Sequence, residues 1–386
     1  MTDAGLARAD SVAAIDYESL ALIDWSFSSA HTRGATHAIH PYPAKFIPQI
    51  PRALIGTLQP RDGTAVLDPF CGSGTTLVEA AAAGFPAVGI DLHPLACLIS
   101  KVKVTPLLAS VSSAAERAVT RAALHRGGTM EIPAVDHWFQ RDVQLELSAL
   151  VLAIAAEPDA DVRDALRVAL SSIIVRVSNQ ESDTRYAAVA KNIHGPNVRV
   201  LFQQAAHKLD LALSKTWARL LPSPHVDVIN RDVLTVAPGD IGRRVSLVVT
   251  SPPYPNAYEY WLYHKYRMYW LGMDPIAVRQ KEIGARPHYF KRHPHTAADF
   301  GRQMAQVFKL LAGVLVPGGH ACFQVGRSII RGEFVDNAAL IRRAAEPYGF
   351  SVAAAMQRTI PQGRKAFNPS HARIKLEDVL VFRLDS

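Results

Sequence analysis

The sequence predicts an α/β fold with a doubly wound, mainly parallel sheet and a helical insertion. Two stretches, at about 64–91 and from about 225 to the end of the chain, alternate short apolar runs with amphipathic helical patterns. This alternation is typical of parallel strands joined by crossover helices. Between them, residues 105–222 show helical spacing throughout. We therefore expect the sheet to be built from two separate parts of the chain.

The first β-α-β unit begins at Thr64. The run "TAVLDPF" predicts a short apolar strand, "CGSG" a tight turn, and "TTLVEAAAAG" a helix that ends at Gly84. "PAVGID" predicts the next strand. Upstream, four prolines in "HAIHPYPAKFIPQIPRALI" are expected to prevent a continuous helix, because proline lacks the amide hydrogen.

Four or five amphipathic helices fill the middle of the chain, from "ERAVTRAALHRG" to "VLFQQAAHKLDLALSKTWARLL", with no convincing strand between them. Strands return with "HVDVIN" and "VSLVVT", and a helix at about 299–315 leads into the strand "GGHACFQVG". A helix near 335–348 and the strands "FSVAAAMQRTI" and "DVLVFRLD" close the chain. The predicted division is a lead-in at 1–30, a first part of the sheet domain at 31–104, the insertion at 105–222, and a second part at 223–386.

The composition indicates a globular and basic protein. Apolar residues make up 49% of the 386 residues and charged residues 20%, so we expect a large buried core. Lys and Arg number 42 against 34 Asp and Glu, and the sequence pI is about 9.4. This balance suits a polyanionic partner such as nucleic acid, although many basic proteins bind none.

Cysteine usage and the termini indicate a reducing compartment. Cys71, Cys97 and Cys322 are odd in number and far apart, and they provide no disulfide framework or zinc spacing. The N-terminus carries acids where a secretory signal needs a basic start. No run of about 18 uncharged apolar residues is present to cross a membrane. We therefore expect a soluble, cytoplasmic protein.

A glycine-rich turn follows the first strand. Asp68 ends that strand, and Gly72 and Gly74 lead into a helix that opens at about Thr75. Glycines allow the backbone to approach a ligand closely, and the new helix offers free amide hydrogens. Any β-to-α connection also needs such a turn. The spacing adds weight, because Asp91 ends the next strand nineteen residues after Gly72, where a carboxylate can chelate a ribose diol.

The residues around this turn favour one class of nucleotide ligand over another. A nicotinamide enzyme uses the same geometry, but Leu77 stands where the third glycine of G-x-G-x-x-G would fall. Acids at both strand ends suit a cationic nucleoside better than a pyrophosphate, which Asp68 would repel. S-adenosylmethionine has a sulfonium, an ammonium and a ribose, and it fits. A third acid, Asp232 in "VINRDVLTV", either accepts a hydrogen bond from the adenine amine or is a solvated loop acid.

The motifs occur in an order that resembles a known family. "LDPFCGSGTT", "GID" and "TSPPY" are similar to motifs of the amino-methylating DNA methyltransferases, which methylate N4 of cytosine or N6 of adenine with S-adenosylmethionine. The resemblance covers about 40–104 and 226–386 and implies a class I methyltransferase-like fold. "HPYPAKFIP" also resembles a segment that helps close the cofactor pocket in that family. The predicted insertion lies before the strand that leads to Asp232, which is earlier in the chain than expected for a segment that only reads DNA. Target recognition or DNA contact is a hypothesis for its role.

The turn, the acids and the resemblance together assign a set of cofactor-binding residues. They are His40, Pro43, Lys45, Phe46, Asp68, Phe70, Gly72, Gly74, Thr75, Asp91, Leu92 and Asp232. The resemblance also implies double-stranded DNA as the substrate. A cognate restriction endonuclease or subunits of a defence system are the partners that it implies, and no membrane is involved.

The prolines of "SPPY" place these residues just beyond the strand "SLVVT", because proline cannot donate to a sheet ladder. An exocyclic amine is a poor nucleophile, since its lone pair is spread into the ring. Backbone acceptors at a rigid corner would localise that lone pair without reorganisation. Within Ser251, Pro252, Pro253 and Tyr254, we assign one acceptor to the Pro252 carbonyl and a hydrogen bond to the Ser251 hydroxyl. Tyr254 would stack on a base that has swung out of the duplex.

The serine favours cytosine N4 as the target. Family members that act on cytosine usually carry serine at this position, and adenine enzymes usually carry Asp or Asn, so N6-adenine methylation is the alternative. A hydroxyl can also donate to ring N3 of cytosine, which an ionised Asp cannot. Methylation of ring carbon 5 needs a cysteine nucleophile, usually in a Pro-Cys pair, and no such pair occurs.

Basic residues follow the corner in "YEYWLYHKYRMYW" and "RQKEIGARPHYFKRHPHT", and recur near the C-terminus. Contact with DNA phosphate is the favoured interpretation and a solvated basic loop is the alternative. The predicted contacts are Lys265, Arg267, Arg279, Lys281, Arg286, Lys291, Arg292, Arg364 and Lys365.

Two rival functions remain. Some RNA base methyltransferases have a very similar "DPFCGSGT" loop, but they usually carry a separate RNA-binding domain before it, and only about 60 residues precede the loop here. The second rival is a methyltransferase-like fold that binds nucleic acid or partners without catalysis. The acids, the glycines and "SPPY" are all present, which disfavours that reading.

Overall fold

A seven-stranded sheet forms the centre of the protein. The computed structural model describes residues 17–43, 46–125, 127–183, 185–218, 224–255, 259–360 and 376–385. The strand order is β10-β11-β7-β6-β1-β2-β5. The bounds are β1 (Ala65–Asp68), β2 (Ala87–Asp91), β5 (Val226–Asn230), β6 (Val245–Thr250), β7 (Leu315–Gly326), β10 (Phe350–Thr359) and β11 (Leu376–Leu384). β11 runs antiparallel to β10 and β7, and the pairs from β7 to β5 are parallel. The prediction of a mainly parallel sheet is confirmed.

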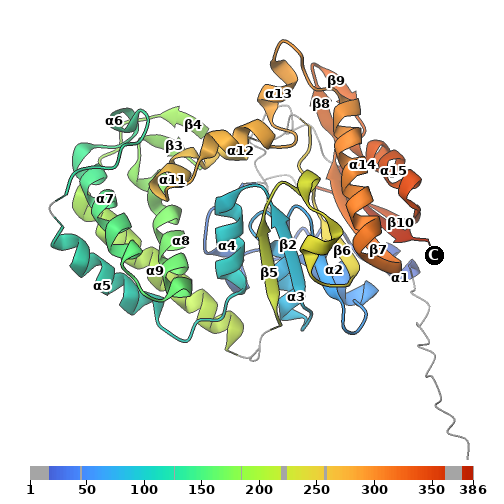
Figure 1. Ribbon diagram of the computed structural model, residues 1–386, viewed down its shortest axis with the longest axis horizontal. Coiled ribbons are helices and arrows are strands. Elements are labelled where there is room, and N and C mark those ends of the chain that lie inside the picture. The colour runs from blue at the N-terminus through green and yellow to red at the C-terminus, as the bar shows by residue number, and fades with distance from the viewer. Residues whose placement is uncertain are drawn as a thin grey trace, which may run out of the picture.

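Helices cover both faces of the sheet (Figure 1). Leu247 and Val249 of β6 pack in one apolar cluster with α2 (Gln49–Leu58), α3 (Thr75–Ala82) and α4 (Pro94–Val104). Val248, between them, packs in a second cluster with α14 (Ala297–Val314) and α15 (Asn337–Ala345). Successive side chains of a strand point to opposite faces, so β6 is buried on both sides. This arrangement confirms the doubly wound architecture.

The insertion is mainly helical. Its elements are α5 (Val111–Ala123), α6 (Val135–Trp138), α7 (Arg141–Ala155), α8 (Ala160–Val177), β3 (Gln180–Ser182), β4 (Arg185–Ala188) and α9 (Gly195–Trp217). The prediction that no strand interrupts the helices is wrong, because β3 and β4 pair as an antiparallel hairpin. The hairpin is supported from outside its own sequence, since the ring of Tyr186 in β4 lies 4.7 Å from that of Trp138. Polar residues without apolar alternation give no local signal for such a strand.

Short elements follow "SPPY" and β7. They are α10 (Tyr260–Tyr263), α11 (Lys265–Trp270), α12 (Pro275–Lys281), α13 (Arg286–Phe290), β8 (Ser328–Ile330) and β9 (Glu333–Val335). The aromatic helix α11 packs against the insertion, where Tyr266 lies 5.5 Å from the ring of Trp138. The remaining short helices are α1 (Glu18–Ala21), η1 (Ala35–Ala38), η2 (Val233–Thr235), η3 (Pro238–Ile241) and η4 (Glu346–Tyr348).

The prolines near the N-terminus mark the start of a helix. α2 begins at Gln49, with Pro48 at its N-cap and Pro51 in its first turn. Proline is tolerated in the first turn because the amide hydrogens there have no partner within the helix. The expectation of no continuous helix therefore holds for the described residues before Gln49, and the last part of the segment is helical.

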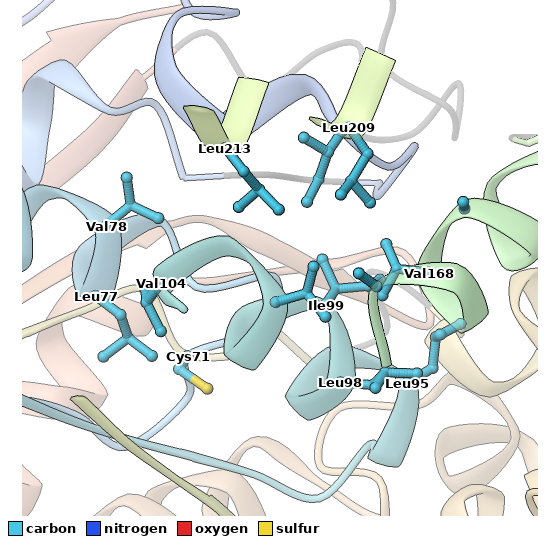
Figure 2. Packing of buried hydrophobic residues seen from close by; sticks show 14 of the residues in the cluster. Cys71, Leu77, Val78, Leu95, Leu98, Ile99, Val104, Val168, Leu209 and Leu213 are labelled. Atoms are coloured by element: carbon cyan, nitrogen blue, oxygen red, sulfur yellow. The ribbon is translucent and has the colours of Figure 1, made fainter. Parts of the chain in front are cut away.

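The apolar core continues from the sheet domain into the insertion. Figure 2 shows Leu77 of α3, Ile99 of α4, Val168 of α8 and Leu213 of α9 as members of one cluster. α4 packs against both α3 and α8. The insertion is therefore anchored through a shared core, and the glycine turn before α3 rests on the same packing. Of the described helices, none combines the length and apolar character that a membrane span requires.

Candidate active site

A cavity opens at the carboxyl ends of β1, β2 and β6. Its empty volume, including the solvent at its mouth, is about 910 Å³. The strand order reverses direction between these strands, and such a switch point is where open α/β sheets bind ligands. The predicted residues that line it are Phe46, Asp68, Phe70, Gly72, Thr75, Asp91, Leu92, Asp232, Ser251, Pro253 and Lys281. Residues that the sequence did not assign also line it, namely Tyr42, Pro69, Cys71, Ser73, His93, Val233, Tyr260, Val278, Glu282 and Ile283.

Residues 68–75, which we call the glycine corner, have a backbone that requires glycine. Gly72 and Gly74 have φ of 50° and 77°, in the left-handed region that favours glycine. A Cβ on Gly74 would lie 2.8 Å from Oγ of Ser100. The Ser100 hydroxyl in turn donates to the Gly72 carbonyl at 2.7 Å. α4 thus supports the corner through Ser100. Gly74 does not itself line the cavity, but its lack of a side chain makes the contact with Ser100 sterically possible.

Two carboxyls shape this corner from the ends of neighbouring strands. Asp68 is 2% exposed and accepts hydrogen bonds on Oδ1 from the Thr250 hydroxyl at 2.6 Å and the Phe70 amide at 3.1 Å. Asp91 accepts from the amides of Gly72 and His93, each at 2.8 Å. Burial raises the pKa of Asp68 and of Asp91 to about 6. Both side chains would gain from a cation in the cavity, which would offset the cost of burying their charge.

Glu282 is a third carboxyl in the cavity, and sequence reasoning missed it. It is 7% exposed, and its two oxygens accept from the amides of Tyr260 at 2.7 Å and Trp261 at 3.3 Å. Burial raises its pKa to about 8. Glu282 lies in the basic segment "RQKEIGARP", which does not follow a predicted strand. Only the packing of that segment against the start of α10 brings its side chain into the cavity.

Asp232 and the N-terminal segment complete the wall. The Asp232 carboxylate caps the short helix η2 by accepting from the amide of Leu234 at 3.0 Å. Tyr42 stacks on Tyr260 with ring centroids 5.6 Å apart and on His264 at 4.9 Å. Two segments more than two hundred residues apart in the chain therefore form one aromatic stack beside the carboxyls.

The segment around "HPYPAKFIP" contributes differently from our prediction. Phe46 lines the cavity, but His40 does not, because its Nε2 bonds to the Ser171 hydroxyl of α8 at 2.9 Å. Pro43 also lies outside the lining residues, and Tyr42 takes its place. Lys45 lies outside the described residues.

Residues 251–254, which we call the proline corner, lie at the end of β6. Ser251 and Pro253 line the cavity, and Pro252 is buried behind them. The Tyr254 hydroxyl lies 3.4 Å from Oγ of Ser251 and donates to the Gln324 carbonyl at 3.4 Å. Tyr254 does not line the cavity, and burial raises the pKa of its phenol.

Two glycines lie close to Tyr254, one beside its ring and the other beside its carbonyl oxygen. A Cβ on Gly326 would lie 2.9 Å from the Tyr254 ring. A Cβ on Gly284, whose φ is 79°, would lie 2.4 Å from the Tyr254 carbonyl oxygen. The segment after α12 therefore packs directly on the proline corner, and this contact requires glycine.

The basic residues after the corner divide into two groups. Arg279, Lys281, Arg286, Lys291 and Arg292 are exposed, and Lys265 is half-buried. The prediction for Arg267 is wrong, because its side chain is 1% exposed and its guanidinium bonds to Asp183 and, at 3.1 Å, to the Ser171 carbonyl. Arg267 thus joins α11 to the insertion. Arg364 and Lys365 lie outside the described residues.

Among the described residues, Cys71 contributes the thiol that lines the cavity. Cys71 is buried, and burial raises the pKa of its thiol well above its usual value. The nucleophile in thiol chemistry is the thiolate, which this environment disfavours. Covalent attack on a pyrimidine ring is therefore not supported at this site.

Comparison with known proteins agrees with the motifs. The model of the N6/N4 methylases, described as DNA methylase, matches residues 17–102. The type II methyltransferase M.MvaI of Kocuria varians is 29% identical over 253 residues, which cover 60% of this chain and 56% of that protein. Over residues 17–102 the chain is thus similar to the N6/N4 DNA methylases. A second type II methyltransferase, M.MjaII of Methanocaldococcus jannaschii, is 46% identical over 68 residues, or 18% of this chain and 13% of that protein.

The extent of these matches is limited. The chain spans about half the length of M.MvaI and a smaller share of M.MjaII. Among solved structures, the rRNA methyltransferase aviRa from Streptomyces viridochromogenes superposes with a TM-score of 0.35 and 12% identity, covering 93% of this chain and 92% of that one. A similarity that low carries no argument about substrate.

Proposed function

We propose that this chain is a DNA methyltransferase that methylates the N4 amine of cytosine in double-stranded DNA, with S-adenosylmethionine as the methyl donor. The observation that carries the proposal is that the buried carboxyls Asp68 and Asp91 and the proline corner residues Ser251 and Pro253 line one cavity. A pocket for a cationic nucleoside and a rigid corner for an amine are thus adjacent. The match of residues 17–102 to the N6/N4 methylase family supports the same conclusion.

The lining residues fit S-adenosylmethionine. The carboxyls of Asp68, Asp91 and Glu282 attract its ammonium and sulfonium groups. Asp91 has already accepted two amide hydrogens, and its remaining lone pairs can accept from the ribose diol. Asp232 is assigned to the adenine amine. The bound cofactor would supply an electrophilic methyl group.

The proline corner would hold the target amine. The Pro252 carbonyl accepts one amine hydrogen, and the Ser251 hydroxyl bonds to the base. These groups are pre-positioned, so they localise the nitrogen lone pair without reorganisation. Tyr254, which is partly exposed at the same corner, is assigned to stack on the swung-out base. The amine loses its proton after the transfer, and no covalent bond to the enzyme is formed.

The exposed cations of α12 and α13 extend the proposal to DNA binding. Arg279, Lys281 and Arg286 lie beside the cavity wall that Val278, Glu282 and Ile283 form. Phosphate contacts there would set the register of the duplex over the corner. A cytoplasmic restriction-modification system is part of the proposal, and the two named relatives, which are type II methyltransferases, support it.

Nucleoside mass spectrometry of DNA from cells that express the chain tests the proposal. We expect N4-methylcytosine with the unchanged chain and none with Ser251→Ala. Ser172→Ala in α8 is the matched control, because its hydroxyl only bonds to the Ala169 carbonyl of its own helix. N6-methyladenine would keep the mechanism and overturn the choice of base. No modified base, together with no binding of S-adenosylmethionine in calorimetry, would favour a binding protein without catalysis.

A further inference from the structure

The β8–β9 hairpin stands at the same edge of the sheet as the proline corner. β6 and β7 are parallel, with Thr250 paired to Phe323, so both strands end at this edge. β7 ends at Gly326, and β8 begins two residues later. Figure 1 shows the hairpin and α13 projecting at the top of the molecule, beyond the carboxyl ends of the strands. Neither the glycine corner nor the proline corner uses the outer part of the hairpin.

The hairpin is rigidly built. Arg331 and Gly332 form its two-residue turn with φ of 53° and 87°, and two left-handed residues are the turn geometry that matches the twist of paired strands. Asn337, which is fully buried at the start of α15, donates to the Gly326 carbonyl at 2.8 Å and to the Ser328 hydroxyl at 2.7 Å. The base of the hairpin is therefore fixed to the fold.

The same base touches the proline corner. Gly326 packs against the ring of Tyr254, and the Tyr254 hydroxyl donates to the carbonyl of Gln324 in β7. The base of the hairpin is therefore in contact with the residue that we assign to the swung-out base.

The outer surface of the hairpin combines an aromatic ring with cations. Phe334 is 61% exposed, although its burial would be favourable. The guanidinium of Arg327 lies 5.6 Å from the centre of its ring, and Arg331 is exposed at the turn. α13 repeats the pattern, with Arg286 at 5.3 Å from the ring of Phe290, which is 54% exposed. The acid on the hairpin surface is Glu333, beside the turn.

We propose that the β8–β9 hairpin is a DNA-contacting element in which Phe334 packs against bases next to the target nucleotide and Arg331 contacts a backbone phosphate. The inference rests on the proposed function and adds a contact that is separate from the basic segment of α12 and α13. Exposed aromatic rings stack on unpaired or unstacked bases, and apolar side chains enter between base steps where a duplex is distorted. Arginine is suited to phosphate because it forms paired hydrogen bonds.

Substitutions at Phe334 test the stacking contact. The probe is a labelled fragment of a plasmid that the unchanged chain methylates, and the readouts are its dissociation constant and the methylation rate. We expect Phe334→Leu to weaken binding about tenfold, because it keeps apolar volume and removes the ring. Phe334→Trp should restore affinity to within about threefold of the unchanged chain, since it keeps a stacking face. The affinity for S-adenosylmethionine should not change in either variant.

Charge substitutions at the turn test the phosphate contact, because removal of a positive charge and removal of a negative charge should change DNA affinity in opposite directions. Arg331→Gln should weaken DNA binding and reduce the slope of affinity against salt concentration by about one. Glu333→Gln should strengthen binding, because it removes the negative charge next to the turn. Arg244→Gln is the matched control, since Arg244 is exposed immediately before β6, at the opposite edge of the sheet. It should leave the salt slope unchanged.

The outcomes separate this proposal from the proposed function. If the unchanged chain neither binds nor methylates plasmid DNA, the proposed function fails, and the hairpin proposal fails with it. If the unchanged chain does both while Phe334→Leu and Arg331→Gln behave like it, the hairpin proposal alone is overturned. A fall in melting temperature for Phe334→Leu that Phe334→Trp does not restore would also overturn it, because Phe334 would then be packing within the chain.

Discussion

The glycine corner and the proline corner occupy equivalent places, each at the carboxyl end of a parallel strand, but they are built in opposite ways. The glycine corner brings charge into the cavity, and its two carboxyls accept from the Thr250 hydroxyl of β6 and from amides of the turns that follow β1 and β2. The proline corner brings a stiff, neutral backbone. It packs against Gly284 and Gly326, which lie in later segments of the chain.

This difference indicates that residues close in sequence determine the glycine corner, whereas residues distant in sequence determine the position of the proline corner. A left-handed turn with acids at strand ends is encoded within about 25 residues, so the arrangement of Asp68, Gly72 and Asp91 is a local property. The placement of the proline corner is a tertiary property, because it needs close backbone contacts from two other segments. Substitutions in the two regions should therefore affect different measured quantities.

The largest effect is expected from Gly74→Ala in the glycine corner. The new Cβ would lie 2.8 Å from Oγ and 3.0 Å from Cα of Ser100, and φ is 77°. Either α4 or the corner must move, so we expect the affinity for S-adenosylmethionine to fall at least about a hundredfold in calorimetry. Gly84→Ala, with φ of 88° and no atom within 4 Å of the new Cβ, is the control for backbone strain alone. Equal losses of cofactor affinity in both variants would show that backbone strain, and not the contact with Ser100, causes the loss.

Gly284→Ala should give the complementary result at the proline corner. Its Cβ would lie 2.4 Å from the Tyr254 carbonyl oxygen, so the corner must shift. A displacement of about 1 Å can cost about a hundredfold in rate. We expect kcat to fall by that order while the cofactor dissociation constant stays within about threefold. Gly272→Ala, with φ of 70° and open space around the new Cβ, is the matched control. A loss of cofactor affinity equal to the loss of rate would mean that the two corners are not independent.

Asp68→Asn should weaken cofactor binding and stabilise the ligand-free chain. Asparagine keeps an oxygen to accept from Thr250 and Phe70 but removes the buried charge. The pKa of Asp68 is raised from 3.8 to about 6, so the folded state holds its proton more tightly than the unfolded state. Stability is therefore lost as pH rises through about 4 to 6, and the loss is complete above that window. We expect the free energy of unfolding of Asp68→Asn to exceed that of the unchanged chain by roughly 1–3 kcal/mol at pH 8.

The stability of the two chains should converge near pH 4, where Asp68 is protonated in the folded state. Cofactor affinity should fall about tenfold in the variant, which corresponds to about 1.4 kcal/mol. Denaturant unfolding at the two pH values and calorimetry at pH 8 measure these effects. A variant that is less stable at pH 8 would show that the Asp68 charge is already compensated without the cofactor.

The smallest effect is a dependence of cofactor affinity on pH. The pKa values of Asp68 and Asp91 are about 6 and that of Glu282 is about 8. A cation favours the ionised carboxyls, so affinity should rise by about tenfold between pH 5.5 and pH 8, with release of protons on binding within that range. Calorimetry in two buffers of different ionisation enthalpy measures the protons released. Asp68→Asn should flatten the part of the profile near pH 6, and a flat profile in the unchanged chain would contradict the prediction.

Patterns that are complete within a short stretch predicted their structure well. The strand-turn-helix unit from Thr64 to Asp91 was predicted with its glycine turn, and Asp68, Gly72 and Asp91 lie together at one end of the sheet. The position of Arg267 was not predictable in this way. It lies in the same basic and aromatic run as Lys265, but helical packing against α8 buries it and pairs it with Asp183. Charge in a sequence indicates a cation without indicating whether it faces solvent or another helix.

The sequence by itself determined the doubly wound sheet, the helical insertion, the acids at the strand ends and the proline corner. These features follow from periodicity, backbone stereochemistry and turn residues, which act over a few neighbouring positions. The tertiary structure alone decided that Glu282 enters the cavity, that Tyr42 stacks on Tyr260, and that the β8–β9 hairpin stands beside Tyr254. Each of these contacts joins segments with no shared local pattern. They form because burying apolar surface and satisfying buried polar groups are properties of the whole packed chain.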